Sequence, residues 1–236
     1  ISYAIADTLK KHLLSLTQAQ ADEINLMLIA EQMLTDHYIL AVEDLLNRVN
    51  VSKDHVQVIG CHGQTIRHQK IQGQLCTLQL GDMEKLAVKT GIPVVGNFRR
   101  RDIALGGQGA PLMPLVHQAL WHEHQDDFAV LNLGGIANIS VFQKGHCILG
   151  FDTGPGNGLM DAWVQKKWDK PYDDQGLIAK SGKVCRDLLA ICLQAPYFKQ
   201  SPPKSTGRDV FHLPWLEHLY PDLASLSAED VLATLV

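Results

Sequence analysis

Apolar side chains recur at every third or fourth position between residues 22 and 49, which is the spacing of one face of an α-helix. The residues that set this spacing are Ile24, Met27, Leu28, Leu34, Tyr38, Val42, Leu45 and Val49. The stretch is predicted to form one long amphipathic helix, and we expect that helix to lie across a β-sheet.

Short apolar runs and one further helical pattern follow this helix. The predicted elements are strands at residues 56–60 and 75–80, a helix at 83–90 that Gly91 ends, and a buried strand at 92–95. This alternation of helices and strands is typical of an α/β fold.

A break in the pattern precedes a second α/β unit. Glycine and proline prevent regular structure at residues 106–111, and a helix is predicted from about 114 to 121. The polar stretch 122–127 is predicted to be the crossover connection to the next unit. The apolar run that starts at Phe128 then begins a new set of strands. We therefore expect two partial domains, at residues 1–125 and 126–236.

Composition favours small-molecule chemistry in the cytoplasm. The 236 residues are 46% hydrophobic, enough for a packed core, and the net charge of −4 argues against nucleic acid or an anionic membrane as partner. No apolar run approaches the ~18 residues of a membrane span. The five cysteines lack a C-x-x-C pair, which is typical of reduced thiols in an intracellular protein.

Eleven histidines raise the question of a metal site. The closest cluster, His117, His122 and His124, lacks the spacing of four residues that puts two imidazoles on one helix face. The sequence therefore predicts surface histidines and no set of protein metal ligands.

A glycine turn joins the first two strands of the second unit. Gly134 and Gly135 lie between the apolar runs 128–131 and 136–141. Backbone N–H groups of such a turn can form a nest that binds an anion, and the side-chain amide of Asn138 can bind the same ligand.

A carboxylate and a second glycine-rich turn follow. Asp152 comes after the predicted strand 147–151, so we expect its side chain to be exposed at a strand tip. Gly154, Gly156 and Asn157 delay regular structure until a helix at about Leu159, whose N-terminus would face the same cleft. The two turns together predict a catalytic site that handles phosphate.

Each turn also has an ordinary structural interpretation. A Gly-Gly pair between strands is a common hairpin connection, and an Asp before a glycine-rich loop often only caps a helix. The chain contains no Walker phosphate loop, and residues 154–159 lack the third glycine of a dinucleotide-binding turn.

Three further polar stretches are candidates for ligand contacts. His62, Gln64 and Thr65 follow a predicted strand as neutral groups of the kind that bind sugar hydroxyls, although a plain polar turn is equally consistent. The second stretch contains the adjacent cations Arg99, Arg100 and Arg101. The third contains a glycine turn with four polar residues, Lys204, Ser205, Thr206 and Arg208. One or two of the arginines are expected to contact an anionic ligand, and the rest to form ion pairs or a solvated face.

Five motifs jointly resemble the anhydro-N-acetylmuramic acid kinases, bacterial enzymes of the sugar kinase, Hsp70 and actin superfamily. They are GCHGQT at residues 60–65, GNFRRRDIALGGQGAPL at 96–112, LNLGGIANIS at 131–140, FDTGPGN with LMDAW at 151–163, and PKSTGR at 203–208. The resemblance covers essentially the whole chain in the family's order. It implies a two-domain actin-like ATPase fold, in which the second domain carries the nucleotide phosphate loop and the catalytic carboxylate.

The resemblance also implies a reaction. ATP-dependent enzymes of this family convert 1,6-anhydro-N-acetylmuramic acid to N-acetylmuramic acid 6-phosphate during cell-wall recycling, and they pair as homodimers. Water attacks the anomeric carbon while O6 takes the γ-phosphoryl group, so a base is needed, and Asp152 is the expected one. Mg²⁺ and the backbone of Gly134 and Gly135 would neutralise the phosphates.

The resemblance assigns the sugar contacts as well. Thr65 and Arg99 are the leading candidates, His62 and Arg100 are weaker ones, and the loop 204–208 is expected to close over the sugar from the second domain. The family's first phosphate loop and its adenosine loop have no counterpart in these residues. We therefore expect an internal portion of a longer chain, inactive alone; robust turnover by the 236-residue chain would contradict this.

Two rival functions use the same residues differently. A nucleotide-gated binding module would do no chemistry, and an inactive Asp152→Asn variant would exclude it. A glycosidase without ATP would need a second carboxylate. Asp161 is the candidate, but the helix predicted from Leu159 is expected to turn it away.

Overall fold

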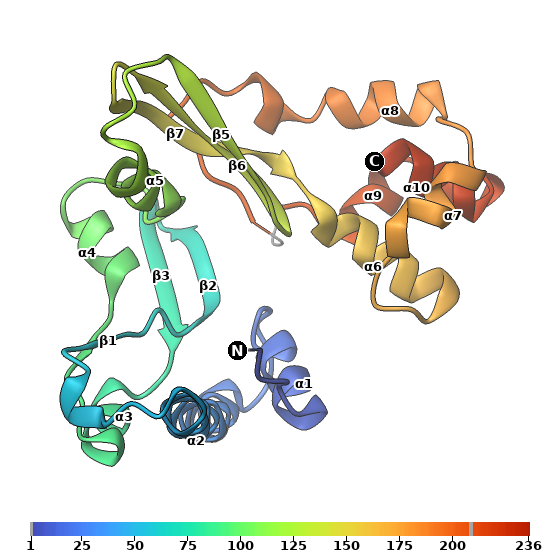
Figure 1. Ribbon diagram of the computed structural model, residues 1–236. Helices are drawn as coiled ribbons and strands as arrows, with labels where there is room; N and C mark the ends of the chain where they lie inside the picture. Colours follow the sequence, from blue (N-terminus) through green and yellow to red (C-terminus); the bar gives the residue numbers. More distant parts are fainter. Residues whose placement is uncertain (1, 208–209) are drawn as a thin grey trace. The chain divides into compact units, whose positions relative to one another are not determined.

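The computed structural model describes residues 2–207 and 210–236, which divide into two compact units, Ile1–Gly109 and Ala110–Val236 (Figure 1). Both units mix helices with strands, as the alternation in the sequence predicted. The β-structure described lies in three small sheets, one of them wholly parallel and two antiparallel.

The first unit has a helical side and two strand pairs. Its helices are α1 (Asp7–Ser15), α2 (Glu23–Val49), α3 (Met83–Thr90) and α4 (Phe98–Ala104), with a 3₁₀ turn at Lys53–His55. Its strands are β1 (Ile59–Gly60), β2 (Gln64–Ile71), β3 (Gln74–Leu80) and β4 (Val94–Val95). β1 pairs with β4 in parallel, and β2 forms an antiparallel hairpin with β3.

The long helix predicted over residues 22–49 is confirmed as α2 (Figure 1). Its buried residues pack with those of the α1 segment and of the hairpin in one cluster: Leu9, Leu13, Leu16, Ala30, Leu34, Ile66 and Leu80. The helix therefore covers a sheet, as expected, although that sheet is only the two-stranded β2–β3 hairpin.

The predicted helix at residues 83–90 is confirmed with its ends. Asp82 caps the first turn of α3, where its side chain accepts from the backbone N–H of Lys85 at 2.8 Å. Gly91 ends α3 in the left-handed region at φ 72°, which a residue with a side chain adopts only at a cost.

Among the helices and strands of the first unit, α1, β2 and α4 were not predicted. β2 consists largely of polar residues, and its extended form is fixed by pairing with β3 rather than by its own pattern. α4 contains the three consecutive arginines, and its few apolar residues are too short a pattern to predict a helix.

The second unit contains a three-stranded sheet, with one α-helix before it in the chain and the others after it. Antiparallel strands β5 (Phe128–Leu133), β6 (Ile136–Gln143) and β7 (His146–Pro155) lie in sequence order. Its α-helices are α5 (Met113–Trp121), α6 (Asn157–Trp168), α7 (Leu177–Ser181), α8 (Arg186–Leu193), α9 (Leu213–Leu219) and α10 (Ala228–Leu235). Its 3₁₀ turns are η2 (Asp174–Gly176), η3 (Pro196–Lys199) and η4 (Pro221–Ser225).

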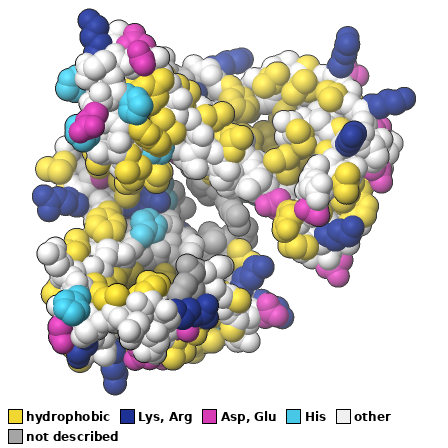
Figure 2. Space-filling model, in the orientation of Figure 1, with side chains coloured by type: hydrophobic (Ala, Val, Ile, Leu, Met, Phe, Trp, Pro, Cys, Tyr) yellow, Lys and Arg dark blue, Asp and Glu magenta, His cyan; other side chains and the backbone are white. Residues whose placement is uncertain are grey.

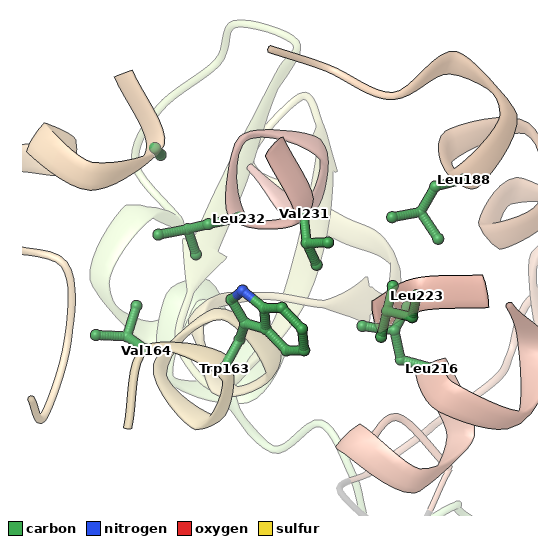
Figure 3. Close-up of a cluster of buried hydrophobic side chains, with 8 residues drawn as sticks. Trp163, Val164, Leu188, Leu216, Leu223, Val231 and Leu232 are labelled. Atoms are coloured by element: carbon green, nitrogen blue, oxygen red, sulfur yellow. The ribbon is translucent and has the colours of Figure 1, made fainter. Parts of the chain in front are cut away.

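The helices α6 to α10 of the second unit contribute to an apolar core (Figure 3). Trp163 lies at its centre, and its indole N–H donates to the carbonyl of Ala228 at 2.9 Å, so the ring's polar end is satisfied. The other labelled members are Val164, Leu188, Leu216, Leu223, Val231 and Leu232.

α5 belongs with the second unit, whereas the sequence put the division after residue 125. His117 Nδ1 of α5 lies 2.9 Å from Ser140 Oγ of β6, and the amide of Gln118 donates to the carbonyl of Gly145 at 2.7 Å. These contacts join α5 to the sheet, and the two units divide between Gly109 and Ala110.

Apolar side chains also lie on the surface of the second unit, where Figure 2 shows them gathered over α5. Leu115 and Leu120 of α5 and Leu131 and Leu133 of β5 are among the exposed ones. In the part of the chain that the structure describes, no helix combines the length and the hydrophobicity of a membrane span.

Candidate active site

The Gly134-Gly135 turn joins β5 to β6, as predicted, and docks onto the start of α6. The carbonyl of Gly135 accepts from the N–H groups of Gly156 and Gly158 at 3.1 and 3.2 Å, and the carbonyl of Gly134 accepts from Asn157 at 2.9 Å. The first N–H groups of α6 are therefore bonded to the turn, and the turn and the helix form one junction.

Close approach explains the glycine at position 156. A Cβ atom there would lie 2.1 Å from the carbonyl oxygen of Gly134, closer than any real contact. Gly154, by contrast, lies against the ring of Phe198 and is buried. Gly156 and Gly158 thus allow backbone to pack on backbone, whereas Gly154 leaves room for an aromatic ring.

Asp152 lies inside β7 and only 4% of its surface is exposed, so the expectation of an exposed strand tip is wrong. β7 continues to Pro155 because Gly154 and Pro155 still pair with Ala137 and Ile136 of β6. Sheet pairing overrides the local preference of a glycine-rich sequence. Within the strand, Asp152 stands opposite Asn138.

Residues of the segment 197–206 hold Asp152 at the edge of the sheet. The phenol of Tyr197 donates to the carbonyl of Asp152 at 2.6 Å, and the N–H of Asp152 donates to the carbonyl of Lys204 at 3.2 Å. The backbone N–H of Thr206 donates to Asp152 Oδ2 at 3.0 Å. Backbone and side chain of the carboxylate residue are therefore all fixed by one segment.

Two buried oxygens beside Asp152 have no hydrogen-bond partner among the described residues. They are Asn138 Oδ1, on the residue opposite Asp152, and Thr206 Oγ1, on the residue that donates to the carboxylate. Most buried polar atoms in proteins are hydrogen-bonded, to protein, water or ligand. A polar ligand or water beside the carboxylate is one partner that either atom can accept.

The residues predicted in the loop 204–208 differ in their contacts. The ammonium of Lys204 donates to the carbonyl of Tyr197 at 3.1 Å and lies 4.7 Å from the centre of the Tyr197 ring. Ser205 is half-buried, and Arg208 lies outside the described residues.

The first unit contains a separate polar group around Arg99. Its Nε donates to His62 Nε2 at 2.8 Å, and its Nη1 donates to the carbonyl of Gly109 at 2.6 Å. The N–H of Gly109 in turn donates to Asp102 Oδ2 at 2.7 Å. The structure thus brings together His62 and Arg99, which are 37 positions apart in the chain.

The hydrogen bonds of His62 determine which nitrogen of its imidazole carries the proton. His62 Nδ1 lies 2.7 Å from the carbonyl of Gly63, so Nδ1 carries the proton and Nε2 accepts from Arg99. Burial, together with the charge of Arg99, lowers the pKa of His62, while the bond to Gly63 acts in the opposite direction. His62 is therefore a neutral acceptor that orients the guanidinium.

The remaining candidates of the first unit lie on β2 and α4. Thr65 Oγ1 accepts from the amide of Gln79 at 3.2 Å, and the exposed Gln64 donates to the carbonyl of Thr65 at 3.2 Å. Arg100 and Arg101 are exposed on α4, which leaves Arg99 as the half-buried arginine of the three.

Sequence reasoning missed the partners of these residues. Tyr197 lies in an apolar stretch with no motif around it, and Gln79 lies in a strand with ordinary alternation. Asp102 directly follows the three arginines, and nothing near it in the sequence indicates its bond to the N–H of Gly109. Nothing local marks these side chains, because their roles depend on residues far away in the chain.

Within the described residues, no group of three His, Cys, Asp or Glu side chains is arranged to hold a metal ion. Mg²⁺ often binds through one or two carboxylates together with water and substrate phosphates. Asp152 and the orphaned oxygen of Asn138 are hard oxygen ligands of the type that Mg²⁺ prefers. The residues present are therefore compatible with a Mg²⁺–nucleotide complex.

Comparison with known proteins gives a consistent match. A family profile described as anhydro-N-acetylmuramic acid kinase matches residues 1–236. Relatives with that name include those of Vibrio cholerae, 45% identical over 99% of this chain, Neisseria meningitidis serogroup C, 47% over 97%, and Shewanella baltica, 44% over 99%. The chain spans 62–63% of the length of these three relatives.

Proposed function

The chain belongs to the anhydro-N-acetylmuramic acid kinase family, and from that membership we propose the activity of the full-length protein. It uses ATP to convert 1,6-anhydro-N-acetylmuramic acid to N-acetylmuramic acid 6-phosphate in cell-wall recycling. Water forms a bond to the anomeric carbon, and the bond from that carbon to O6 breaks. O6 then bonds to the γ-phosphorus of ATP, while the bond from that phosphorus to the β-phosphate oxygen breaks and ADP leaves.

Asp152 is the proposed base, which takes a proton from the attacking water. One observation carries this proposal: a buried carboxylate, held by a backbone N–H, lies beside two buried oxygens that have no partner among the described residues. A water that hydrogen-bonds to Asn138 or Thr206 would be placed next to the carboxylate. Such positioning contributes much of the rate in enzymes that activate water.

The sugar contacts remain proposals for both units. In the first unit we propose Arg99, oriented by His62, together with Thr65, and more weakly Gln64 and Arg100. In the second unit we propose the loop with Lys204, Ser205, Thr206 and Arg208. The hydrogen bond from Thr206 to Asp152 supports this part, because it ties the loop to the proposed base.

The phosphate contacts are proposed for the junction of the Gly134-Gly135 turn with α6, including Asn138, Gly154, Gly156 and Asn157. The N–H groups of Gly156 and Asn157 already bond to the turn. Their proposed role is therefore to keep the junction rigid and to let a phosphate group approach its backbone closely. Bound Mg²⁺ would supply positive charge to the phosphates.

We also propose that the two units correspond to the two domains of an actin-like ATPase fold, the first with sugar contacts and the second with the nucleotide loop and Asp152. Family resemblance supports a cytoplasmic homodimer. The exposed apolar side chains over α5 are compatible with a covered surface, without locating the dimer contact.

An isotope experiment on the full-length protein tests the reaction. The enzyme is mixed with 1,6-anhydro-N-acetylmuramic acid, ATP and Mg²⁺ in ¹⁸O-labelled water, and mass spectrometry locates the label. We expect label at the anomeric hydroxyl of a 6-phosphorylated product. Unlabelled product that keeps its anhydro bridge would indicate a plain sugar kinase, absence of product a binding module, and hydrolysis without ATP a glycosidase.

A further inference from the structure

Three hydrogen bonds of Asp152 are made with one short segment, and two residues of that segment also bond to each other. Tyr197, Lys204 and Thr206 each bond to Asp152, and the ammonium of Lys204 also bonds back to the carbonyl of Tyr197. We call these three residues the Asp152 clamp. Nothing in the sequence motifs or in the comparisons assigns Tyr197 a role.

The geometry of the clamp explains how a tyrosine can act on a carboxylate without touching it. The N–H and the carbonyl of a strand residue point to the same side of the strand. Both groups of Asp152 bond to the clamp, so they face the edge of β7 that lies away from β6. Tyr197 thereby fixes the backbone from which the carboxylate projects.

Tyr197 is itself firmly held. Only 6% of its surface is exposed, and its ring makes edge contacts with Phe198 and Phe211 at centroid distances of 6.1 and 5.7 Å. Its phenol makes the 2.6 Å bond from this packed position, which is short for a bond between O–H and O. A rigid donor of this kind limits the freedom of the atom it binds.

We infer that Tyr197 is a positioning residue for Asp152, which it holds in place through the backbone carbonyl at the edge of β7. The inference rests on the proposed function, in which Asp152 activates water. Tyr197 contacts neither substrate in this role. Its effect should therefore appear in the chemical step and not in binding, since a small misplacement of a catalytic group costs rate.

The test is the Tyr197→Phe variant of the full-length protein, which keeps the ring and removes only the donor. We expect kcat to fall about tenfold, with KM for the anhydrosugar and for ATP within about twofold of the parent. Tyr172→Phe, at a tyrosine of the same unit that is 55% exposed, is the matched control and should change neither constant.

The melting temperatures of both variants are measured, and Asp152→Asn is assayed beside them. These measurements distinguish a failure of the positioning role from a failure of the proposed function. If Tyr197→Phe keeps the parent's kcat while Asp152→Asn is inactive, the positioning role is overturned and the proposed base stands. A rise in KM with unchanged kcat would also overturn it, since that is the mark of a binding residue. If Asp152→Asn keeps its activity, the proposed function itself fails.

Discussion

At the scale of single residues, the candidate site depends on groups whose protonation and orientation are set by their neighbours. His62 is neutral because burial and Arg99 disfavour its charged form, and Asp152 is fixed by three bonds from one segment. These arrangements lead to two predictions about side chains.

Asp152→Asn should lower kcat of the full-length enzyme by at least about a hundredfold, because an amide cannot accept the proton of water. The substitution keeps the size of the side chain, and Asn can still accept from the N–H of Thr206. Steady-state assays of phosphorylated sugar give the value. Asp161→Asn on α6 is the matched control; a comparable loss there would favour a pair of carboxylates and thus the glycosidase alternative.

His62 should make stability depend on pH in the mildly acidic range. Its folded pKa is lowered, so below about pH 6.5 the unfolded chain binds the proton more readily and the free energy of unfolding falls as pH falls. Urea denaturation at about pH 7.5 and pH 5.5 measures the difference. His62→Gln should show a smaller loss on acidification than the parent; an equal loss would assign the effect to other groups.

At the scale of elements, the junction between the Gly134-Gly135 turn and α6 joins a hairpin to a helix without side chains between them. Three backbone bonds and a close approach at Gly156 form this contact. The pairing of β6 with β7 then places Asn138 opposite Asp152.

Gly156→Ala should destabilise the second unit by about 1–3 kcal/mol, because its methyl group would overlap the carbonyl oxygen of Gly134 and separate the turn from the helix. Gly134→Ala is the matched control. Its Cβ would lie 3.5 Å from the nearest atom, an ordinary contact, so stability should change much less. Chemical denaturation of both variants compares the two; equal losses would contradict the overlap argument.

At the scale of the whole molecule, each unit has a hydrophobic core of its own. Leu34 lies in the core of the first unit and Leu216 in the core of the second, with 1% and 0% of their surfaces exposed. Separate cores are the physical basis for separate domains.

Leu34→Ala and Leu216→Ala should each destabilise their own unit by about 2–5 kcal/mol, since each leaves a cavity in a packed core. Hydrogen exchange read by peptide mass spectrometry should show lost protection mainly between residues 2 and 109 for the first variant and mainly after residue 110 for the second. Uniform loss of protection in both units would indicate one cooperative core.

The sequence by itself determined the elements with strong local signals and the family. α2, α3 and the Gly134-Gly135 turn all follow from periodicity, capping residues and turn residues within a few positions of one another. The five motifs carried the family resemblance, and these depend on residue identity alone.

Only the tertiary structure decided how the site is built. It extended β7 past Asp152 and buried the carboxylate, and it brought Tyr197 and Thr206 to that residue from 45 and 54 positions away. It likewise joined His62 to Arg99 and turned β2 from a polar stretch into a strand. The physical reason is that a local pattern records which face of an element is apolar, whereas a hydrogen bond between distant segments forms only when folding brings both partners together.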